Sequence, residues 1–236
     1  MLSKEEMKRY MKQVMLDDIG INGQIKLKQA KVAVVGAGGL GCPVLQYLGA
    51  MGIGTIGVID FDVVDESNLH RQVLYTSEDV GKKKVDVAIE RVSKQNPFIT
   101  LIKHDVMLDE NNAKEIFKDY DFVIDGCDNF MTRYAVNDIC VALNKALVYG
   151  SILGYEGQLA VFNYNGSKNL RDIFPEPPNA EDVPSCSENG VLGIVPGIIG
   201  NMMAQEAVNM IMETPSLLNS LAIVNCRFHT INKIQF

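Results

Sequence analysis

The sequence predicts an α/β fold of the Rossmann type: a mainly parallel sheet with helices on both faces, to which the C-terminal part adds antiparallel strands. Short, almost continuous apolar runs alternate along the chain with stretches of helical spacing, as in buried parallel strands joined by crossover helices. A glycine-rich turn, GAGGLG (36–41), stands where the first apolar run meets a helix. The 236 residues are enough to bury one continuous core.

The first 30 residues predict a helical arm. Residues 3–19 have the spacing of an amphipathic helix, with Ser3 as its N-cap and Glu6 as the capping-box partner. A second short helix is expected over 23–30. One face of the first helix needs a surface to cover because it carries the apolar side chains of Met7, Tyr10, Met11, Val14 and Met15.

Residues 31–156 predict a nucleotide-binding core. The first strand, helix and second strand have the lengths of a βαβ unit, and the alternation then continues. Strands are expected at 31–36, 55–60, 100–106, 122–126 and 146–152, and helices at 40–51, 82–95, 111–118 and 132–143.

The pattern changes from residue 157 onward. A hairpin strand is expected at 158–166, and residues 167–189 form a long acidic loop rich in Pro and Asn, a length typical of functional or disordered loops. Residues 191–212 are apolar enough to suggest a membrane span, but polar side chains interrupt them, which favours a helix buried in the core or at a subunit interface. Residues 220–236 alternate like an antiparallel strand pair.

Composition and charge limit the partners. Lys and Arg number 22 against 29 Asp and Glu, a net charge of −7, so no basic field favours nucleic acid or an anionic membrane. The N-terminus lacks the apolar region of a secretory signal, and no shift in composition separates two domains, so we expect one cytoplasmic domain over 1–236. The five cysteines form no CxxC pair and suit reduced thiols, with Cys42, Cys127, Cys140 and Cys226 in the core.

The glycine-rich turn predicts a nucleotide site. Gly36, Gly38, Gly39 and Gly41 let the backbone turn tightly and approach phosphate groups, and the helix that follows presents N–H groups to negative charge. Asp60 ends the next strand, where a carboxylate accepts hydrogen bonds from ribose hydroxyls. The motif alone does not distinguish a dinucleotide from ATP.

Polar residues beyond the same edge of the sheet favour ATP. Lys84 opens a helix, and Asp128 and Asn129 follow the fourth strand. A triphosphate needs cations to neutralise its charge and a carboxylate to hold Mg²⁺, whereas a nicotinamide enzyme needs a hydride-accepting geometry. The alternative interpretation is that these groups form solvated surface pairs. The residues expected at this rim after the second strand are Asp62, Ser67, Asn68, Arg71 and Gln72.

Several sequence blocks together resemble the ThiF, MoeB and HesA adenylyltransferases, which are related to the E1 ubiquitin-activating enzymes. They run in one order over nearly the whole chain. The resemblance implies a homodimer that uses MgATP to adenylate the C-terminal Gly-Gly carboxylate of a small ubiquitin-like sulfur carrier, for thiamine or molybdopterin synthesis. The blocks include RYMKQ (9–13), GAGGLG, DFDVVDESNLHRQ (60–72), VGKKK (80–84), DGCDNF (125–130), GQLAVF (157–162), FPEPP (174–178) and VPSC (183–186).

The resemblance also implies roles for individual residues. Gly39 would approach the phosphates and Asp60 would bind the ribose. Asp128 would hold Mg²⁺. Cys186 resembles the cysteine of the loop that covers the adenylate in this family, and both a covalent role and an incidental thiol are open for it. The triphosphate would be held by Asn68, Arg71 and Lys84.

Two departures from the family pattern stand out. Relatives usually carry two CxxC pairs for a structural zinc, but the first pair falls here on Asn169 and Asp172, so we expect no zinc. The fourth residue of RYMKQ is usually an Arg that reaches the ATP of the partner subunit, and here it is Lys12, which keeps the charge but not the bidentate fork.

The sequence is compatible with three other functions. The chain could adenylate a different peptide or carrier, which the sequence barely distinguishes from a sulfur carrier. It could be an NAD-dependent oxidoreductase, which only the glycine motif favours. It could also be a degenerate nucleotide-binding scaffold, since Lys12 and the lost cysteines depart from the family pattern.

Overall fold

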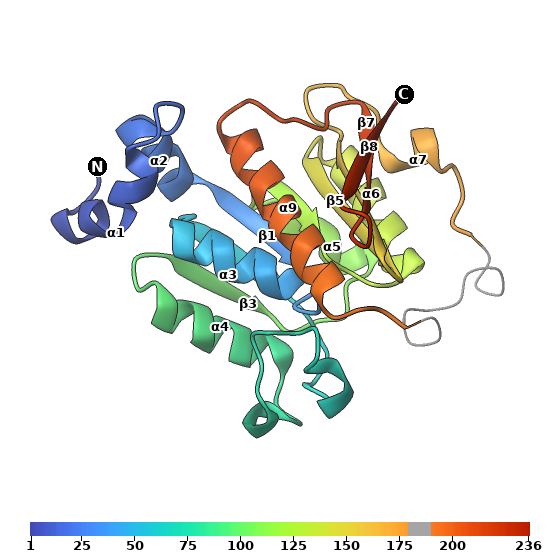
Figure 1. Ribbon diagram of the computed structural model, residues 1–236, viewed down its shortest axis with the longest axis horizontal. Coiled ribbons are helices and arrows are strands. Elements are labelled where there is room, and N and C mark those ends of the chain that lie inside the picture. Colours follow the sequence, from blue (N-terminus) through green and yellow to red (C-terminus); the bar gives the residue numbers. More distant parts are fainter. Residues whose placement is uncertain (179–189) are drawn as a thin grey trace.

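A mixed eight-stranded sheet runs through the computed structural model, which describes residues 1–178 and 190–236 (Figure 1). The strand order is β3-β2-β1-β4-β5-β6-β7-β8. The first five strands are parallel and the last three antiparallel, which confirms the predicted fold class. The strands are β1 (Lys31–Val35), β2 (Thr55–Ile59), β3 (Thr100–His104), β4 (Phe122–Asp125), β5 (Ala146–Leu153), β6 (Glu156–Phe162), β7 (Ser220–Asn225) and β8 (Thr230–Gln235).

Helices cover both faces of the sheet. α3 packs on α4 and α9 over one face, while α5 packs on α6 over the other (Figure 1). Side chains of β1 alternate between the two layers: Val32 and Val34 join the first core cluster, and Ala33 and Val35 the second. These helices are α3 (Gly41–Met51), α4 (Lys84–Gln95), α5 (Glu110–Phe117), α6 (Phe130–Ala142) and α9 (Ile194–Ile211), with short turns η1 (Glu66–Asn68) and η2 (Ser77–Asp79) between β2 and α4.

The N-terminal arm consists of two helices rather than one long helix and a short one. α1 (Lys4–Val14) begins with the predicted capping box, in which the Glu6 amide donates to Ser3 Oγ at 3.1 Å. α1 ends five residues before the predicted boundary at 19, and α2 (Gly20–Gln29) starts at Gly20 with a φ of 56°. Two consecutive aspartates, Asp17 and Asp18, follow α1, where the partial negative charge of a helix C-terminus disfavours carboxylates.

The arm is anchored on the C-terminal ends of α3 and α4. Tyr10 is 3% exposed, and its hydroxyl accepts a hydrogen bond from Asn96 Nδ2 at 2.8 Å. Gly52, after α3, has no room for a Cβ because the Tyr10 ring lies against it. Gln13 donates to the Met51 carbonyl at 2.8 Å. The predicted apolar face is thus partly used to dock the arm.

Two expectations about the C-terminal half need correction. The predicted loop 167–189 contains a short helix, α7 (Leu170–Ile173), which is capped by Asn169 and Asp172. Cys226 is only partly buried because it lies in the turn between β7 and β8, whereas Cys42, Cys127 and Cys140 are buried as predicted.

In α9, predicted at 191–212, residues such as Val195 and Ile199 pack into the core. Among the described residues, no helix is long and apolar enough to cross a membrane.

Candidate active site

Two tight turns meet where the strand order reverses, between β1 and β4. Gly36 has a φ of 87°, and a Cβ on it would lie 2.8 Å from the Gly126 carbonyl oxygen. The Gly126 amide in turn donates to the Val35 carbonyl at 2.8 Å. Gly41 has no room for a Cβ against the Gly36 carbonyl. Ligands of open α/β sheets bind in the crevice at such a reversal, so the predicted glycine turn lies at the expected place.

The other two glycines of the turn lie beneath side chains of α9 and of the segment after η1. A Cβ on Gly39 would come 3.1 Å from Pro196 and 3.7 Å from Arg71 Cγ, and one on Gly38 would lie 3.6 Å from Gln72 Nε2. A side chain on Gly39 would therefore crowd Pro196, whereas one on Gly38 would make ordinary contact with Gln72. Pro196, at the start of α9, lies against the turn although the sequence analysis assigned it no role there.

Asp60 is a buried carboxylate that receives two backbone hydrogen bonds. Its Oδ2 accepts from the Ala37 amide at 2.7 Å, and its Oδ1 accepts from the Asp62 amide at 2.8 Å. Burial raises the pKa of Asp60, and the two amide donors oppose that rise. Each carboxylate oxygen has a second lone pair, so Asp60 retains acceptors for hydroxyl groups.

Lys84 is paired with Asp62 at the start of α4. Its Nζ lies 2.9 Å from Asp62 Oδ2, and the Lys84 side chain is 6% exposed against 49% for Asp62. The Tyr75 hydroxyl donates to the Ala37 carbonyl at 2.7 Å and so ties the loop before α4 to the glycine turn. Sequence reasoning missed Tyr75, because a lone aromatic residue carries no signal of such a contact.

A chain of hydrogen bonds fixes the amides of Asn68 and Gln72. Asp65 Oδ1 can only accept, so the Ser67 hydroxyl donates to it at 2.5 Å and accepts from Asn68 Nδ2 at 3.3 Å. Asn68 Oδ1 then accepts from Gln72 Nε2 at 2.6 Å. Gln72 Oε1 is left as a buried side-chain oxygen without a hydrogen-bond partner within the described residues, and such a group needs a donor.

Arg71 lies over the turn, between Gly39 and η1. It is half-buried, and its Nη1 donates to the Ser67 carbonyl at 3.2 Å. Arg71 and Lys84 are the two cations that the sequence predicted at this edge of the sheet.

Asp128 and Asn129 follow β4 at the same edge of the sheet. Both are exposed, and Asn129 is the N-cap of α6, where its Oδ1 accepts from the Thr132 amide at 2.9 Å. This hydrogen bond occupies the Oδ1 atom of Asn129, a residue that the sequence predicted to bind the cofactor, and leaves its Nδ2 group. Most predicted rim residues therefore gather around the β1–β4 reversal.

Lys12 lies at the other end of α3. Its helix contacts Met51 at the C-terminus of α3, whereas the glycine turn precedes the N-terminus, and 11 helical residues span roughly 16 Å. Lys12 is exposed and does not belong to the site of its own chain. Cys186 lies outside the described residues, so its role stays a prediction.

The described thiols near the site are not activated nucleophiles. Burial raises the pKa of Cys42 to about 12 and raises that of Cys127 well above its ordinary value. Asn169 and Asp172, at the positions of the family's first CxxC pair, bind each other in the cap of α7: the Asn169 amide donates to Asp172 Oδ2 at 2.8 Å. Within the described residues, no group of three or more His, Cys, Asp or Glu side chains could hold a metal.

A comparison with protein families decides which family has this arrangement. The model of the ThiF family matches residues 10–235. The chain belongs to the ThiF family. This confirms the resemblance to E1-like adenylyltransferases that the sequence blocks suggested, and with it the prediction of an E1-like nucleotidyltransferase enzyme.

Curated relatives of this ThiF-family chain carry related names. It is 49% identical over 215 residues to the "Sulfur carrier protein adenylyltransferase" of Thermus thermophilus, covering 89% of this chain and 79% of that protein. It is 48% identical over 214 residues to the "Probable adenylyltransferase/sulfurtransferase MoeZ" of Mycobacterium tuberculosis, covering 89% of this chain but 55% of that protein. The chain thus spans about half the length of MoeZ.

Solved structures agree on the fold. The crystal structure of PaaA superposes with a TM-score of 0.83 at 24% identity, covering 99% of this chain and 74% of PaaA. The crystal structure of Escherichia coli MccB with ATP superposes with a TM-score of 0.80 at 23% identity, covering 90% of this chain and 64% of MccB. At these identities the likeness establishes the architecture alone.

Proposed function

We propose that this chain is an ATP-dependent adenylyltransferase that activates the C-terminal Gly-Gly carboxylate of a small ubiquitin-like sulfur-carrier protein as an acyl-adenylate and releases pyrophosphate. One observation carries the proposal: a glycine turn that has no room for a Cβ at Gly36 or Gly41 lies where the strand order reverses, with Arg71 near Gly39 and with Asp60 hydrogen-bonded to the turn. Lys84 pairs with Asp62, which Asp60 binds through its backbone amide. The names of the curated relatives support the carrier as substrate.

The residues fit a nucleoside triphosphate. The turn at Gly38 and Gly39 would admit phosphate groups, and Arg71 and Lys84 would neutralise their charge. The free lone pairs of Asp60 suit ribose hydroxyls, and the unpaired Gln72 Oε1 needs a donor that the described residues do not supply. Mg²⁺ bound at Asp128 would supply charge neutralisation and orientation of the phosphates.

The reaction asks for positioning rather than for a base. The attacking carboxylate of the carrier is ionised at neutral pH, so no proton has to be removed before its oxygen bonds to the α-phosphorus. The bond from that phosphorus to the bridging oxygen breaks, and pyrophosphate leaves with the electron pair. Arg71 and Lys84 would stabilise the charge that shifts onto pyrophosphate, which is the main catalytic requirement of such a transfer.

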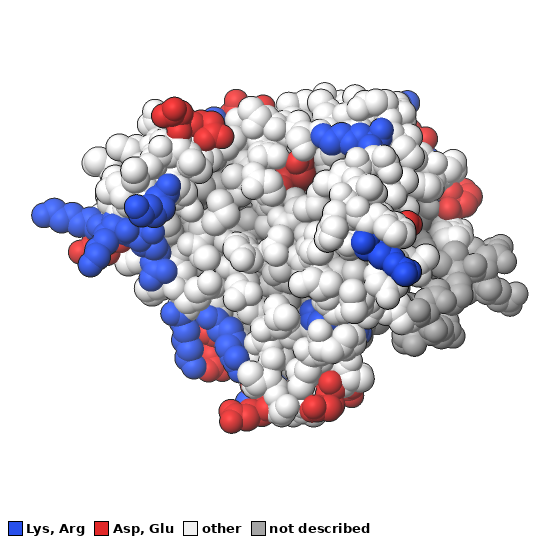
Figure 2. All heavy atoms as spheres, in the orientation of Figure 1, with Lys and Arg blue, Asp and Glu red and all other residues white. Residues whose placement is uncertain are grey.

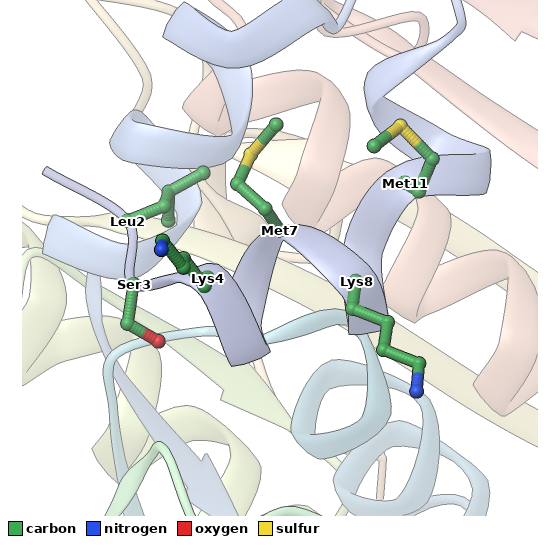
Figure 3. A pocket seen from close by; sticks show the side chains of 6 residues that line it. All are labelled: Leu2, Ser3, Lys4, Met7, Lys8 and Met11. Carbon is green, nitrogen blue, oxygen red and sulfur yellow. The ribbon is translucent and has the colours of Figure 1, made fainter.

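We also propose that the protein acts as a homodimer in which Lys12 serves the site of the partner. Lys12 projects from an arm anchored at the far end of its own α3. Lys and Arg side chains gather at this end of the molecule in Figure 2. A shallow cavity of about 460 Å³ lies along the same helix, where Leu2, Met7 and Met11 extend to one side in Figure 3. Apolar side chains beside the exposed Lys12 suit a subunit contact.

The test is ATP–pyrophosphate exchange with purified protein and candidate carriers that end in Gly-Gly. We expect carrier-dependent exchange, lost in Arg71→Ala and kept in Arg227→Ala, a matched control whose side chain lies against Tyr155 and Phe228. Exchange with a different peptide would change the substrate and keep the chemistry. Tight MgATP binding without exchange for any carboxylate would contradict the proposal and favour a scaffold.

Mixing two inactive variants tests the dimer. Lys12→Met removes the arm cation, and Lys84→Met removes a cation of the site. If Lys12 acts on the partner, mixed dimers contain one site with both cations intact, so mixing restores part of the exchange activity. A mixture as inactive as its components, although the subunits have exchanged, would contradict action across the interface.

A further inference from the structure

Arg133 is a buried cation of α6 that the proposed chemistry does not use. It is 4% exposed, and its Nε donates to Asp125 Oδ2 at 3.1 Å, where Asp125 is fully buried at the end of β4. Burying such a pair contributes little net stability, because the loss of hydration offsets the attraction between the charges. The Arg133–Asp125 pair therefore matters more for the groups that it holds in place than for stability.

Arg133 and Asp125 together bind the backbone carbonyl and the backbone amide of Cys127. Arg133 Nη2 donates to the Cys127 carbonyl at 2.8 Å, and Asp125 Oδ1 accepts from the Cys127 amide at 3.0 Å. Nη2 also donates to the Gly150 carbonyl at 2.9 Å, and Nη1 donates to Ser151 Oγ at 3.2 Å, which ties the turn to β5. The planar guanidinium thus joins two segments, the end of β4 with the turn after it and β5, through several N–H donors held in a fixed geometry.

Asp128 lies between two residues that are fixed in this way. Cys127 precedes it, and Asn129 follows it as the N-cap of α6. The Asp128 side chain itself is exposed and has no hydrogen-bond or ion-pair partner within residues 1–178 and 190–236. Its neighbours are thus bound to the protein, while none of the described residues binds its own carboxylate.

We propose that Arg133 is a positioning residue that holds the Asp128 carboxylate at the nucleotide edge through the Cys127 backbone, and that its loss selectively weakens binding of the magnesium complex of ATP. The inference rests on the proposed function in that ATP and Mg²⁺ are taken as the ligands. Arg133 itself is not proposed to contact ATP or Mg²⁺. Its effect on binding comes from holding the Asp128 carboxylate in position.

The experiment is a double-mutant cycle measured by calorimetry of ATP binding, once with excess Mg²⁺ and once with EDTA. The ratio of the two affinities is the magnesium enhancement. We expect Asp128→Asn to abolish most of it and Arg133→Lys, which keeps the charge but loses the fork, to reduce it by about tenfold. In the double variant the enhancement should fall no further than in Asp128→Asn alone, because residues that act through one group are not additive.

The matched control is Arg171→Lys, whose side chain pairs with Asp138 on α6 at 2.7 Å and should leave the enhancement unchanged. Additive losses, an equal loss of affinity in EDTA, or an unchanged enhancement in folded Arg133→Lys would each overturn the proposal. If Arg133→Lys does not fold, Ser151→Ala removes one anchor of the guanidinium and should give a smaller loss, absent in the Asp128→Asn background.

The outcomes separate this inference from the proposed function. Absence of a magnesium enhancement in the wild-type protein overturns the role of Arg133 and leaves exchange activity as the test of adenylation. A normal enhancement without exchange for any carrier contradicts adenylation of carriers and leaves the positioning role standing.

Discussion

The Lys84 ammonium lies 2.9 Å from the Asp62 carboxylate, with the Lys84 side chain almost fully buried and the Asp62 side chain half-exposed. The proposed phosphate-binding cation therefore has a counter-ion within the protein itself. A triphosphate that approached Lys84 would compete with Asp62 for its charge. Asp62 thus lowers the cost of burying the Lys84 ammonium and would weaken its attraction for phosphate.

Replacement of Asp62 by Asn should separate these two effects. The nucleotide-free protein should lose about 1 kcal/mol of unfolding free energy, a modest amount because Asp62 is half-exposed. ATP affinity should rise on the order of fivefold, which corresponds to about 1 kcal/mol. Denaturant unfolding and calorimetry measure the two quantities. Weaker ATP binding in a folded variant would show that Asp62 helps to hold the nucleotide.

Lys84→Met should reduce pyrophosphate exchange roughly 100-fold, the usual loss when one donor to a developing negative charge is removed. Lys83→Met is the matched control: the neighbouring Lys83 donates to the Phe61 carbonyl at 2.8 Å and pairs with Asp105 at the surface. Its exchange rate should stay within twofold of wild type by the low worth of surface pairs. Equal losses in the two variants would assign the effect to general surface charge.

Lys12→Arg should speed exchange, because a guanidinium can bind phosphate oxygens in a bidentate fork and an ammonium cannot. We expect a gain of about tenfold in the chemical step with little change in thermal stability, since Lys12 is exposed on α1. Formation of the acyl-adenylate in a single turnover, with enzyme in excess over the carrier, measures this step. An unchanged rate would mean that Lys12 either already suffices or lies outside the reaction.

Removal of tightly bound metals should leave the folded protein unchanged. Asn169 and Asp172 cap α7, and Arg171 pairs with Asp138, so these contacts order the segment where the family usually has its first CxxC pair. After treatment with a strong chelator and resupply of Mg²⁺, both the melting temperature and the exchange rate should match the untreated protein. A lasting fall in melting temperature, restored by zinc, would reveal a structural metal.

Stability should fall in mild acid because of His104. Burial lowers the pKa of His104 below its ordinary 6.5, with a smaller opposing effect of Asp119. The unfolded chain then binds a proton that the folded chain resists, so stability is complete above about pH 6.5 and decreases as the pH falls from there toward the lowered pKa. Unfolding free energies of His104→Gln should decline less between pH 7 and 5. A parallel decline in the two proteins would exclude His104 as the cause.

The sequence predicted the fold class because its signals are local. Apolar runs of strand length, helical spacing and the turn at Gly36 are each specified by neighbouring residues, and the predicted strands match the observed ones to within a few residues. Boundaries failed where weak local preferences compete, as between α1 and α2. The helix α7 was missed because its cap, Asn169 with Asp172, lies in a stretch that resembles a loop.

Residue type and motif order also identified most of the candidate site. Cations and carboxylates in a polar stretch after a buried strand predict a ligand edge, which placed Asp60, Arg71 and Lys84 together. The contributions of Tyr75, Pro196 and Arg133 carried no comparable signal. Each acts on a residue distant in the sequence, so that only the folded chain brings the partners into contact.

The sequence by itself therefore determined the architecture, the glycine turn and the charged groups at the edge of the sheet, since these follow from periodicity, backbone sterics and residue chemistry. The tertiary structure decided which charges are paired, as Lys84 is with Asp62, and which are buried, as Arg133 is with Asp125. It also placed Lys12 away from its own site. The physical reason is that pairing and burial depend on distances across the fold, which no local pattern encodes.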